Sequence, residues 1–175
     1  MATTYKAIAT VTVGSGGAAN IEFTSIPQTY TDLVVKLSAR TSDNDSLHYG
    51  LVYVTVNNNT SGIYDNRRLF GYGTTTGSAS NTDSTSWATT AAGSSATAST
   101  FGNAEFYFPN YTSSNNKSLS LDTVVETNDA TNNLLVLFAG LAETTSAITS
   151  IKFGATSGQT LAQYSTATLY GIKNS

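Results

Sequence analysis

The sequence predicts an all-β fold: an antiparallel β-sandwich of the jelly-roll type, with about ten strands and one long Ser/Thr-rich loop. The first observation is composition, because Thr, Ser and Asn supply 67 of the 175 residues, whereas the helix formers Glu, Lys and Met number four, five and one. The second is a repeated alternation of apolar and polar residues over short segments, which indicates half-buried strands. The third is the recurrence of turn-forming residues between these segments. A hydrophobic content of 39% argues against disorder.

The first half of the chain contains four such segments, and turn-forming residues separate them. In the first segment Ala7, Ala9 and Val11 fall on one face, since successive residues of a strand point to opposite sides of a sheet. The glycine-rich stretch 14–17 ends this strand, because glycine readily adopts the positive φ angles of tight turns. The expected strands span residues 5–13, 20–24, 33–40 and 47–56.

The second half follows the same pattern in six further segments. Aromatic residues mark the segment that begins at Phe101, and Pro109 and Asn110 close it. Residues 139–146 allow one helical turn as an alternative, which their three Thr and Ser residues weaken. A chain of this length predicts one domain, residues 1–175. The expected strands span residues 67–73, 101–108, 117–127, 133–139, 148–153 and 166–172.

The segment 74–100 differs from the rest of the chain. Of its 27 residues 16 are Thr or Ser, and it holds one charged residue, Asp83, and one large apolar residue, Trp87. One interpretation is a surface loop; the other is an arm that reaches a neighbouring subunit with Trp87 as its anchor, since Trp offers a large contact area. The N-terminal segment 1–6 is a second expected interface element. The candidate interface residues are therefore Trp87, Thr74, Thr100, Tyr5 and Lys6.

Catalytic patterns are absent from the sequence. The single histidine, His48, falls in the expected strand 47–56 on the face of Gly50 and Val52, and no Gly-x-Ser-x-Gly elbow accompanies it. We therefore interpret it as a structural or interface histidine. Glycoside hydrolysis needs two carboxylates flanking the bond, and nothing in the sequence distinguishes an acid from a nucleophile. Its acidic candidates are Asp43 with Asp45, and Asp122 with Glu126. The sequence predicts no enzyme and no catalytic residue.

Metal and cofactor sites are not expected either. The chain has no Cys and one His, so the usual zinc ligand sets cannot form. Residues 43–47 begin like a calcium loop, but Leu47 stands where a third oxygen ligand is needed, which favours an Asx-turn.

The charge and hydropathy patterns bear on partners and location. The sequence pI is about 4.9 and the only basic doublet is Arg67-Arg68, which argues against nucleic-acid binding. No segment reaches the roughly 18 apolar residues of a membrane span. Residues 1–6 lack the apolar segment of a signal peptide, so we expect synthesis in a cytoplasm.

The aromatic residues have two interpretations. In one interpretation they form a sugar-binding platform; in the other they form the core of the sandwich. Their alternating spacing favours the core interpretation. The residues concerned are Tyr49, Tyr53, Tyr64, Phe70, Tyr72, Tyr107 and Tyr111.

Three stretches carry a resemblance to a known group of proteins. Residues 19–34 contain the run Ile-Pro-Gln-Thr-Tyr-Thr-Asp-Leu, residues 166–173 contain Leu-Tyr-Gly-Ile, and residues 67–73 read Arg-Arg-Leu-Phe-Gly-Tyr-Gly. These stretches resemble small structural proteins of tailed bacteriophages, with those of marine and cyanobacterial phages nearest. The resemblance implies a virion component with a β-sandwich or jelly-roll fold and no enzymatic activity, and it implies no catalytic residues.

Two functional hypotheses follow. The first is a capsid decoration or cement protein on the outer surface of the particle, assembled in the host cytoplasm, a homo-oligomer that binds the major capsid protein or other virion proteins. The alternative is a tail-fibre or receptor-binding module that recognises host-surface glycans. In that case Trp87 and exposed tyrosines would stack on sugars, while Asp43 and Asn44 would bond hydroxyls.

Overall fold

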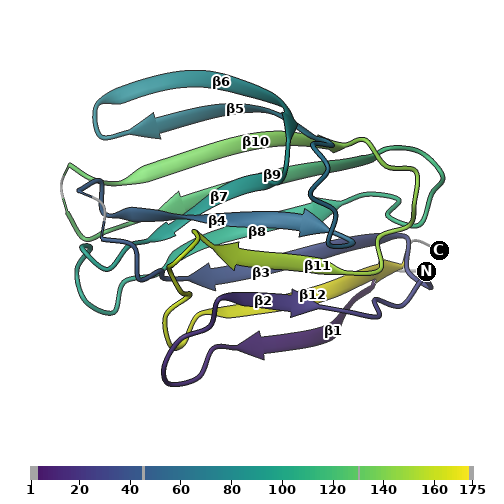
Figure 1. Cartoon of the computed structure of the whole chain (residues 1–175), viewed down its shortest axis with the longest axis horizontal. Helices are drawn as coiled ribbons and strands as arrows, with labels where there is room; N and C mark the ends of the chain where they lie inside the picture. The colour runs from purple at the N-terminus through teal and green to yellow at the C-terminus, as the bar shows by residue number, and fades with distance from the viewer. Residues whose placement is uncertain (1–3, 45, 130, 174–175) are drawn as a thin grey trace.

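The structure is a computed structural model that describes residues 4–44, 46–129 and 131–173. Among these residues there are twelve strands, all pairs within the sheets are antiparallel, and no helix occurs. The strands form an eight-stranded sheet in the order β1-β12-β3-β8-β9-β10-β5-β6 and a four-stranded sheet in the order β2-β11-β4-β7 (Figure 1). The predicted all-β sandwich is confirmed, while the jelly-roll connectivity stays a prediction. The strands are β1 (Thr4–Thr12), β2 (Asn20–Phe23), β3 (Asp32–Ala39), β4 (Tyr49–Val56), β5 (Tyr64–Tyr72), β6 (Thr75–Ser84), β7 (Trp87–Ala92), β8 (Gly102–Phe108), β9 (Lys117–Val125), β10 (Leu134–Ala142), β11 (Ile151–Ala155) and β12 (Thr166–Lys173).

The core lies between the two sheets, and side-chain alternation produces it. In β9 buried and exposed residues alternate without a break, as expected for a strand with one face on the core and one in solvent. Phe106 of β8 packs edge-to-face on Phe153 of β11, with ring centroids 5.0 Å apart, and so joins the sheets. Phe23 of β2 packs on Phe153 in the same way at 6.4 Å. No helix of the described residues is long and apolar enough to span a membrane.

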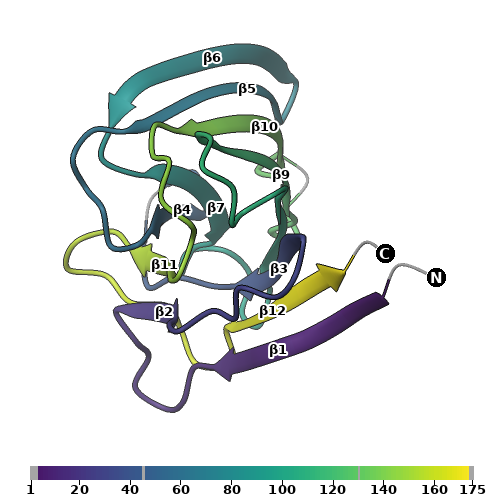
Figure 2. The same cartoon turned by 90° about the vertical axis from the view of Figure 1, so that its right-hand side faces the viewer.

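The large sheet curves strongly at one end. Figure 2 shows β10, β5 and β6 arching over β7, the edge strand of the small sheet. As a result, the inner face of β5 looks toward β7 and β4, and its outer face looks away from the sandwich. This curvature gives β5 two distinct environments on its two sides.

Residues 74–100 do not form the single long loop that the sequence predicts. They form β6 and β7, with the loop confined to the residues that follow β7. Thr is β-branched and favours extended backbone, so a Thr-rich segment pairs readily when a partner strand is present. β6 pairs with β5, and β7 pairs with β4. The low apolar content of β6 follows from its position at a sheet edge, where most of its side chains are exposed.

Two smaller expectations are also corrected. Residues 139–142 continue β10 and form no helical turn. His48 precedes β4 in a bend with φ 63°, so it does not share a strand face with Gly50 and Val52.

Two of the stretches that carry the phage resemblance lie side by side. β3 pairs with β12, with Leu33 opposite Gly171 and Val34 opposite Tyr170. The ring of Tyr30 lies directly over Gly171, where an added Cβ would stand 2.4 Å from Tyr30 Cγ. Glycine at 171 is therefore a packing requirement of this contact. The Tyr-Thr-Asp-Leu and Tyr-Gly-Ile motifs meet in one structural unit.

Candidate functional site

A cleft of about 730 Å³ opens between β5–β6 of the large sheet and β4–β7 of the small sheet. Its volume falls within the range of small-molecule sites. Leu121 of β9 and Leu134 and Val136 of β10 contribute apolar surface to its lining. The other lining residues are Tyr49, Leu51, Tyr53, Asn66, Arg68, Phe70, Tyr72, Asn81, Asp83, Ser84, Thr85, Ser86, Ala88, Thr89 and Thr90.

Strand periodicity determines which side chains reach the cleft. In β5 every second residue from Asn66 to Tyr72 lines it, because alternate side chains share a face. In β4 the alternate residues Tyr49, Leu51 and Tyr53 do the same. The residues between them in β4, such as Val52, belong to the core. β4 and β5 thus each contribute one face to the cleft, and residues of β6, β7, β9 and β10 complete its lining.

The aromatic residues divide between cleft and core. Four of the seven line the cleft: Tyr49, Tyr53, Phe70 and Tyr72. Tyr49 and Tyr72 pack edge-to-face with ring centroids 6.0 Å apart. Of the remaining three, Tyr64 and Tyr111 are fully buried in the core, and the Tyr107 hydroxyl donates to Asp32 Oδ2 at 2.9 Å. The core interpretation is therefore correct for Tyr64 and Tyr111. Tyr49, Phe70 and Tyr72 line the cleft and also pack, partly buried, against a small core cluster, whereas Tyr53 belongs to neither core cluster.

Three buried polar side chains that line the cleft lack a partner. Asn66 Oδ1, Thr89 Oγ1 and Thr90 Oγ1 form no hydrogen bond with any described residue. These residues are only 7%, 3% and 8% exposed. A buried polar group without a partner destabilises a fold by about 1–3 kcal/mol, and nearly all such groups in native proteins are satisfied. The three atoms are themselves almost inaccessible to solvent, so they lie within the wall of the cleft and are not presented on its surface.

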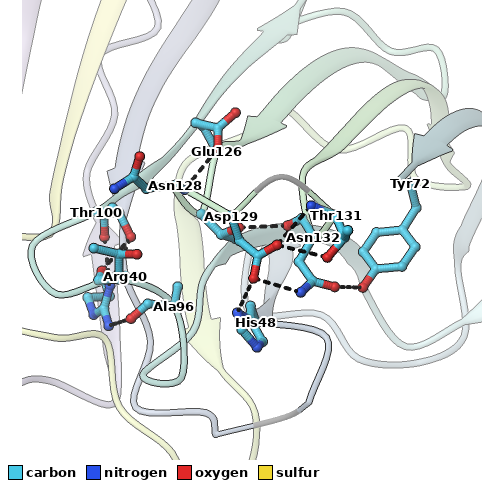
Figure 3. A network of polar contacts seen from close by, with 12 residues as sticks. Arg40, His48, Tyr72, Ala96, Thr100, Glu126, Asn128, Asp129, Thr131 and Asn132 are labelled. Atoms are coloured by element: carbon cyan, nitrogen blue, oxygen red, sulfur yellow. Dashed lines mark hydrogen bonds and ion pairs between the residues drawn. The ribbon is translucent and has the colours of Figure 1, made fainter. Parts of the chain in front are cut away.

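A hydrogen-bonded loop supports one wall of the cleft (Figure 3). The Tyr72 hydroxyl donates to Asn132 Oδ1 at 2.6 Å, and Asn132 Nδ2 donates to Asp129 Oδ2 at 3.2 Å. The Thr127 hydroxyl donates to the Asn132 carbonyl at 2.9 Å. Asp129 Oδ2 lies 3.9 Å from His48 Nδ1. His48 thus belongs to a network behind the cleft wall and does not line the cleft itself.

This network predicts an acid sensitivity of the loop around Asp129. The pKa of Asp129 lies below its ordinary value of 3.8, first because the Thr131 backbone N–H donates to it, then because of the Thr131 hydroxyl and the Asn132 amide. A lowered pKa in the folded state contributes stability that is present above the unfolded value and is lost as pH falls through the folded value. We expect hydrogen-exchange protection of the Thr131 amide to hold above about pH 4 and to decline below it.

The matched variant for this prediction is Asp129→Asn. It keeps the side-chain shape but removes the titrating carboxylate. Its Thr131 protection should be weaker above about pH 4 and should change little on acidification. Equal acid dependence in both proteins would contradict the role given to Asp129.

The structure separates the five predicted interface residues. Trp87 is 0% exposed, and its indole N–H donates to the Asp65 carbonyl at 3.1 Å, so its prediction as an exposed anchor is wrong. Thr74 is exposed between β5 and β6, whereas Thr100 is half-buried and accepts hydrogen bonds from Arg40. Tyr5 and Lys6 are exposed on β1, an edge strand, while residues 1–3 lie outside the described residues.

The polar residues proposed for sugar contacts also lie elsewhere. Asp43 and Asn44 do not line the cleft, and neither does Trp87. Asp45, the partner of Asp43 in one suggested acid pair, lies outside the described residues. In the part of the chain that the structure describes, no group of three or more His, Asp or Glu side chains could hold a metal ion.

A second candidate surface, which the sequence analysis missed, lies on the outer side of the large sheet. Leu69 of β5, Leu135 and Leu137 of β10 and Val124 of β9 are 59%, 56%, 59% and 44% exposed. Leu137 stands opposite Leu69 in the register, and Leu135 stands opposite Val124. We call these four residues the outer apolar face. The alternation of residues 133–139 could have predicted this face, since Leu135 and Leu137 lie on the same side of that strand.

Comparison with known proteins finds no family model that matches this chain and no curated protein that matches it.

Proposed function

We propose that this chain is a non-enzymatic structural protein of a tailed-bacteriophage particle, and specifically a decoration protein on the outside of the capsid. The outer apolar face is the observation that carries this proposal. The resemblance of residues 19–34, 67–73 and 166–173 to phage structural proteins supports a tailed bacteriophage as the particle.

The outer apolar face has the character of an attachment surface. Its four aliphatic side chains lie on three adjacent strands and are each at least 44% exposed. Contiguous exposed apolar patches on soluble proteins mark interaction sites, because covering them removes apolar area from water. Outward-facing Arg67, Asp122 and Ser120 lie beside the patch, as polar residues do at the rim of an interface.

The partner of this surface is the capsid shell in our proposal. A small patch gives weak binding for one copy, since interface area alone does not determine affinity. A shell presents many equivalent sites, so contacts between neighbouring copies add avidity without enlarging any single contact. The edge strands β1 and β6 are open for such lateral contacts, and exposed Tyr5 and Lys6 lie on β1.

Attachment through the outer apolar face leaves the cleft open. In β5, Leu69 points outward, whereas its neighbours Arg68 and Phe70 line the cleft on the opposite side. A copy seated on the shell through Leu69, Leu135 and Leu137 would therefore present the cleft to the surroundings of the particle.

The test is reattachment of purified protein to particles that lack it. We expect the double variant Leu135→Ser/Leu137→Ser to lower occupancy on the particle at least tenfold at subsaturating concentration. Its thermal stability should remain near wild type, since exposed substitutions usually change stability by less than about 0.5 kcal/mol. Occupancy is measured by quantitative mass spectrometry of sedimented particles.

The control variant is Leu47→Ser/Tyr164→Ser, which removes two exposed apolar side chains that do not belong to the outer apolar face. This control should bind as wild type does. Unchanged occupancy of the Leu135→Ser/Leu137→Ser variant would exclude this face as the attachment surface.

A further inference from the structure

We infer that β6 joins two copies of this chain. The β6 strands of the two copies lie side by side and antiparallel about a two-fold axis, so that the two eight-stranded sheets become one continuous sheet. This pairing stands on β6 alone and does not depend on attachment to a virion.

β6 is an edge strand whose outer side is open. It is the last strand of the large sheet, and it pairs with β5. Figures 1 and 2 show it as the outermost strand at one end of the molecule. In an antiparallel ladder about half of the backbone N–H and C=O groups point away from the partner strand, and at an edge they meet no other strand. In the part of the chain that the structure describes, residues 75–82 form no backbone–backbone hydrogen bond outside the β5–β6 ladder.

The sequence of β6 lacks the features that protect sheet edges from pairing. Native edges are protected by charged residues, above all Lys, by Pro, by bulges and by short length. Residues 75–82 read Thr-Thr-Gly-Ser-Ala-Ser-Asn-Thr, with no charged residue and no Pro. Their register with β5 runs without a shift from the Thr75–Tyr72 pair to the Asn81–Asn66 pair. Because these side chains are small, ordering them in a contact loses little conformational entropy.

The other three edges are less suited to pairing. β1 carries Lys6, and its register with β12 shifts between Ala7 and Ala9, as it does at a bulge. β2 has only four residues and includes the charged Glu22. β7 is mostly buried, beneath the arch of β10, β5 and β6 (Figure 2). Of the four edges, β6 is therefore the one that best accepts an added strand.

A second copy is the partner that fits this edge. Antiparallel pairing of β6 with itself places the end of each strand beside the start of the other. Asp83, the only charged residue of β6, then lies beside the uncharged, Thr-rich start of its partner, so like charges do not meet. Thr hydroxyls on adjacent strands also bond each other, as those of Thr10 and Thr168 do at 3.1 Å between β1 and β12. Two identical edges thus form the self-complementary contact of a two-fold dimer.

The geometry of this dimer bears on attachment. A two-fold axis that relates antiparallel neighbours stands perpendicular to the sheet, so the outer apolar faces of both copies lie on the same side of the joined sheet. Leu69 of β5 stands opposite Ser78 of β6, and the two β5 strands would be about 14 Å apart across the joint. One dimer would therefore present two outer apolar faces to one shell. This consequence rests on the proposed function, whereas the pairing of β6 does not.

The test is sedimentation equilibrium of the purified full chain from about 1 μM to about 1 mM, which covers weak and moderate affinities. We expect a reversible equilibrium between monomer and dimer. The decisive variant is Ser78→Lys/Ser80→Lys, which places like charges at the joint and should raise the dimer Kd about tenfold or more. Both serines are exposed, so the variant should unfold at a temperature near that of wild type.

The matched control is Thr10→Lys/Thr12→Lys on β1, the opposite edge of the same sheet. Both threonines are exposed there, so the control adds the same charge to a similar surface. It should dimerise as wild type does. The inference is overturned if wild type stays monomeric over the whole range, or if Ser78→Lys/Ser80→Lys dimerises as wild type does.

Disulfide crosslinking locates the joint independently. The chain has no Cys, so a single introduced Cys forms a disulfide only with its counterpart in a second copy. This requires Cα atoms within about 7 Å of each other, as they are near a two-fold axis. Cys is placed at each position from 76 to 80 in turn, and the variants are oxidised with copper phenanthroline. We expect a maximum of disulfide-linked dimer within this range, and no more than background for Thr10→Cys.

Crosslinking across 76–80 no higher than that of Thr10→Cys would contradict the pairing. Dimerisation is measured without particles, and attachment is measured with Leu135→Ser/Leu137→Ser, so failure of either proposal leaves the other testable.

Discussion

Replacing Trp87 by Ala should lower the free energy of unfolding by about 3–5 kcal/mol, the usual effect of removing a large aromatic side chain from a core. Trp87 is 0% exposed and packs edge-to-face on Tyr64, with ring centroids 4.9 Å apart. Its ring also lies against Gly140, where an added Cβ would stand 2.8 Å from the indole nitrogen. Equilibrium denaturation in urea measures the change.

The control for this variant is Tyr5→Ala. Tyr5 is 56% exposed on an edge strand, so its removal should change stability by less than about 0.5 kcal/mol in the isolated protein. An effect of Trp87→Ala as small as that of Tyr5→Ala would mean that Trp87 is not a core residue and would restore its interpretation as an exposed anchor.

Replacing Arg40 by Met should lower the free energy of unfolding by about 2–4 kcal/mol and should disorder the loop that follows β7, since hydrogen bonds from a charged donor contribute about 1.5–3 kcal/mol each and this site is partly solvated. The guanidinium donates to the carbonyls of Ser94, Ala96, Thr97 and Thr100 and to the Thr100 hydroxyl, at 2.9–3.1 Å (Figure 3). Burial lowers the pKa of Arg40 from its ordinary value. Urea denaturation measures the global effect, and hydrogen exchange across residues 93–100 measures the local one.

The matched control for Arg40 is Arg67→Met. Arg67 is exposed on the outer side of β5, so the same loss of charge there should have little effect on either measurement. Full retention of protection across residues 93–100 in Arg40→Met would contradict the organising role of Arg40.

Strands with strong alternation could be predicted from the sequence. The expected segment 33–40 corresponds to β3, and 117–127 contains β9. One face of β9 packs on the core and the other meets solvent, and β3 shows the same alternation from Val35 to Ala39. The sandwich class followed from these strands and from the scarcity of helix formers. Local periodicity carried this information, so no knowledge of distant contacts was needed.

β6 and β7 could not be predicted, because their structure depends on partners far away in the sequence. β6 lies at an edge and has no buried residue, so it lacks the alternation of apolar and polar residues that identifies a strand. The burial of Trp87 requires Tyr64 and Gly140, which belong to two other strands. A long Thr-rich segment with Trp87 as its one large apolar residue was therefore interpreted as a loop.

The sequence predicted the types of residue that line the cleft but not the cleft itself. Aromatic residues in β4 and β5 suggested either a platform or a core, and the choice depends on the curvature that brings β5 over β7. Sequence alternation assigns residues to two faces of a strand, but it does not say which face is covered. The two faces of β5 have different surroundings: Arg68 and Phe70 line the cleft, whereas Leu69 belongs to the outer apolar face.

We have proposed that this chain is a structural protein on the outer surface of a phage particle. The most direct measurement is cryo-electron microscopy of purified particles combined with mass spectrometry of their proteins. We expect the chain to be present in many copies, with a β-sandwich seated on the shell through Leu69, Leu135 and Leu137 and its cleft facing outward. Absence of the chain from particles that are otherwise complete would contradict the claim.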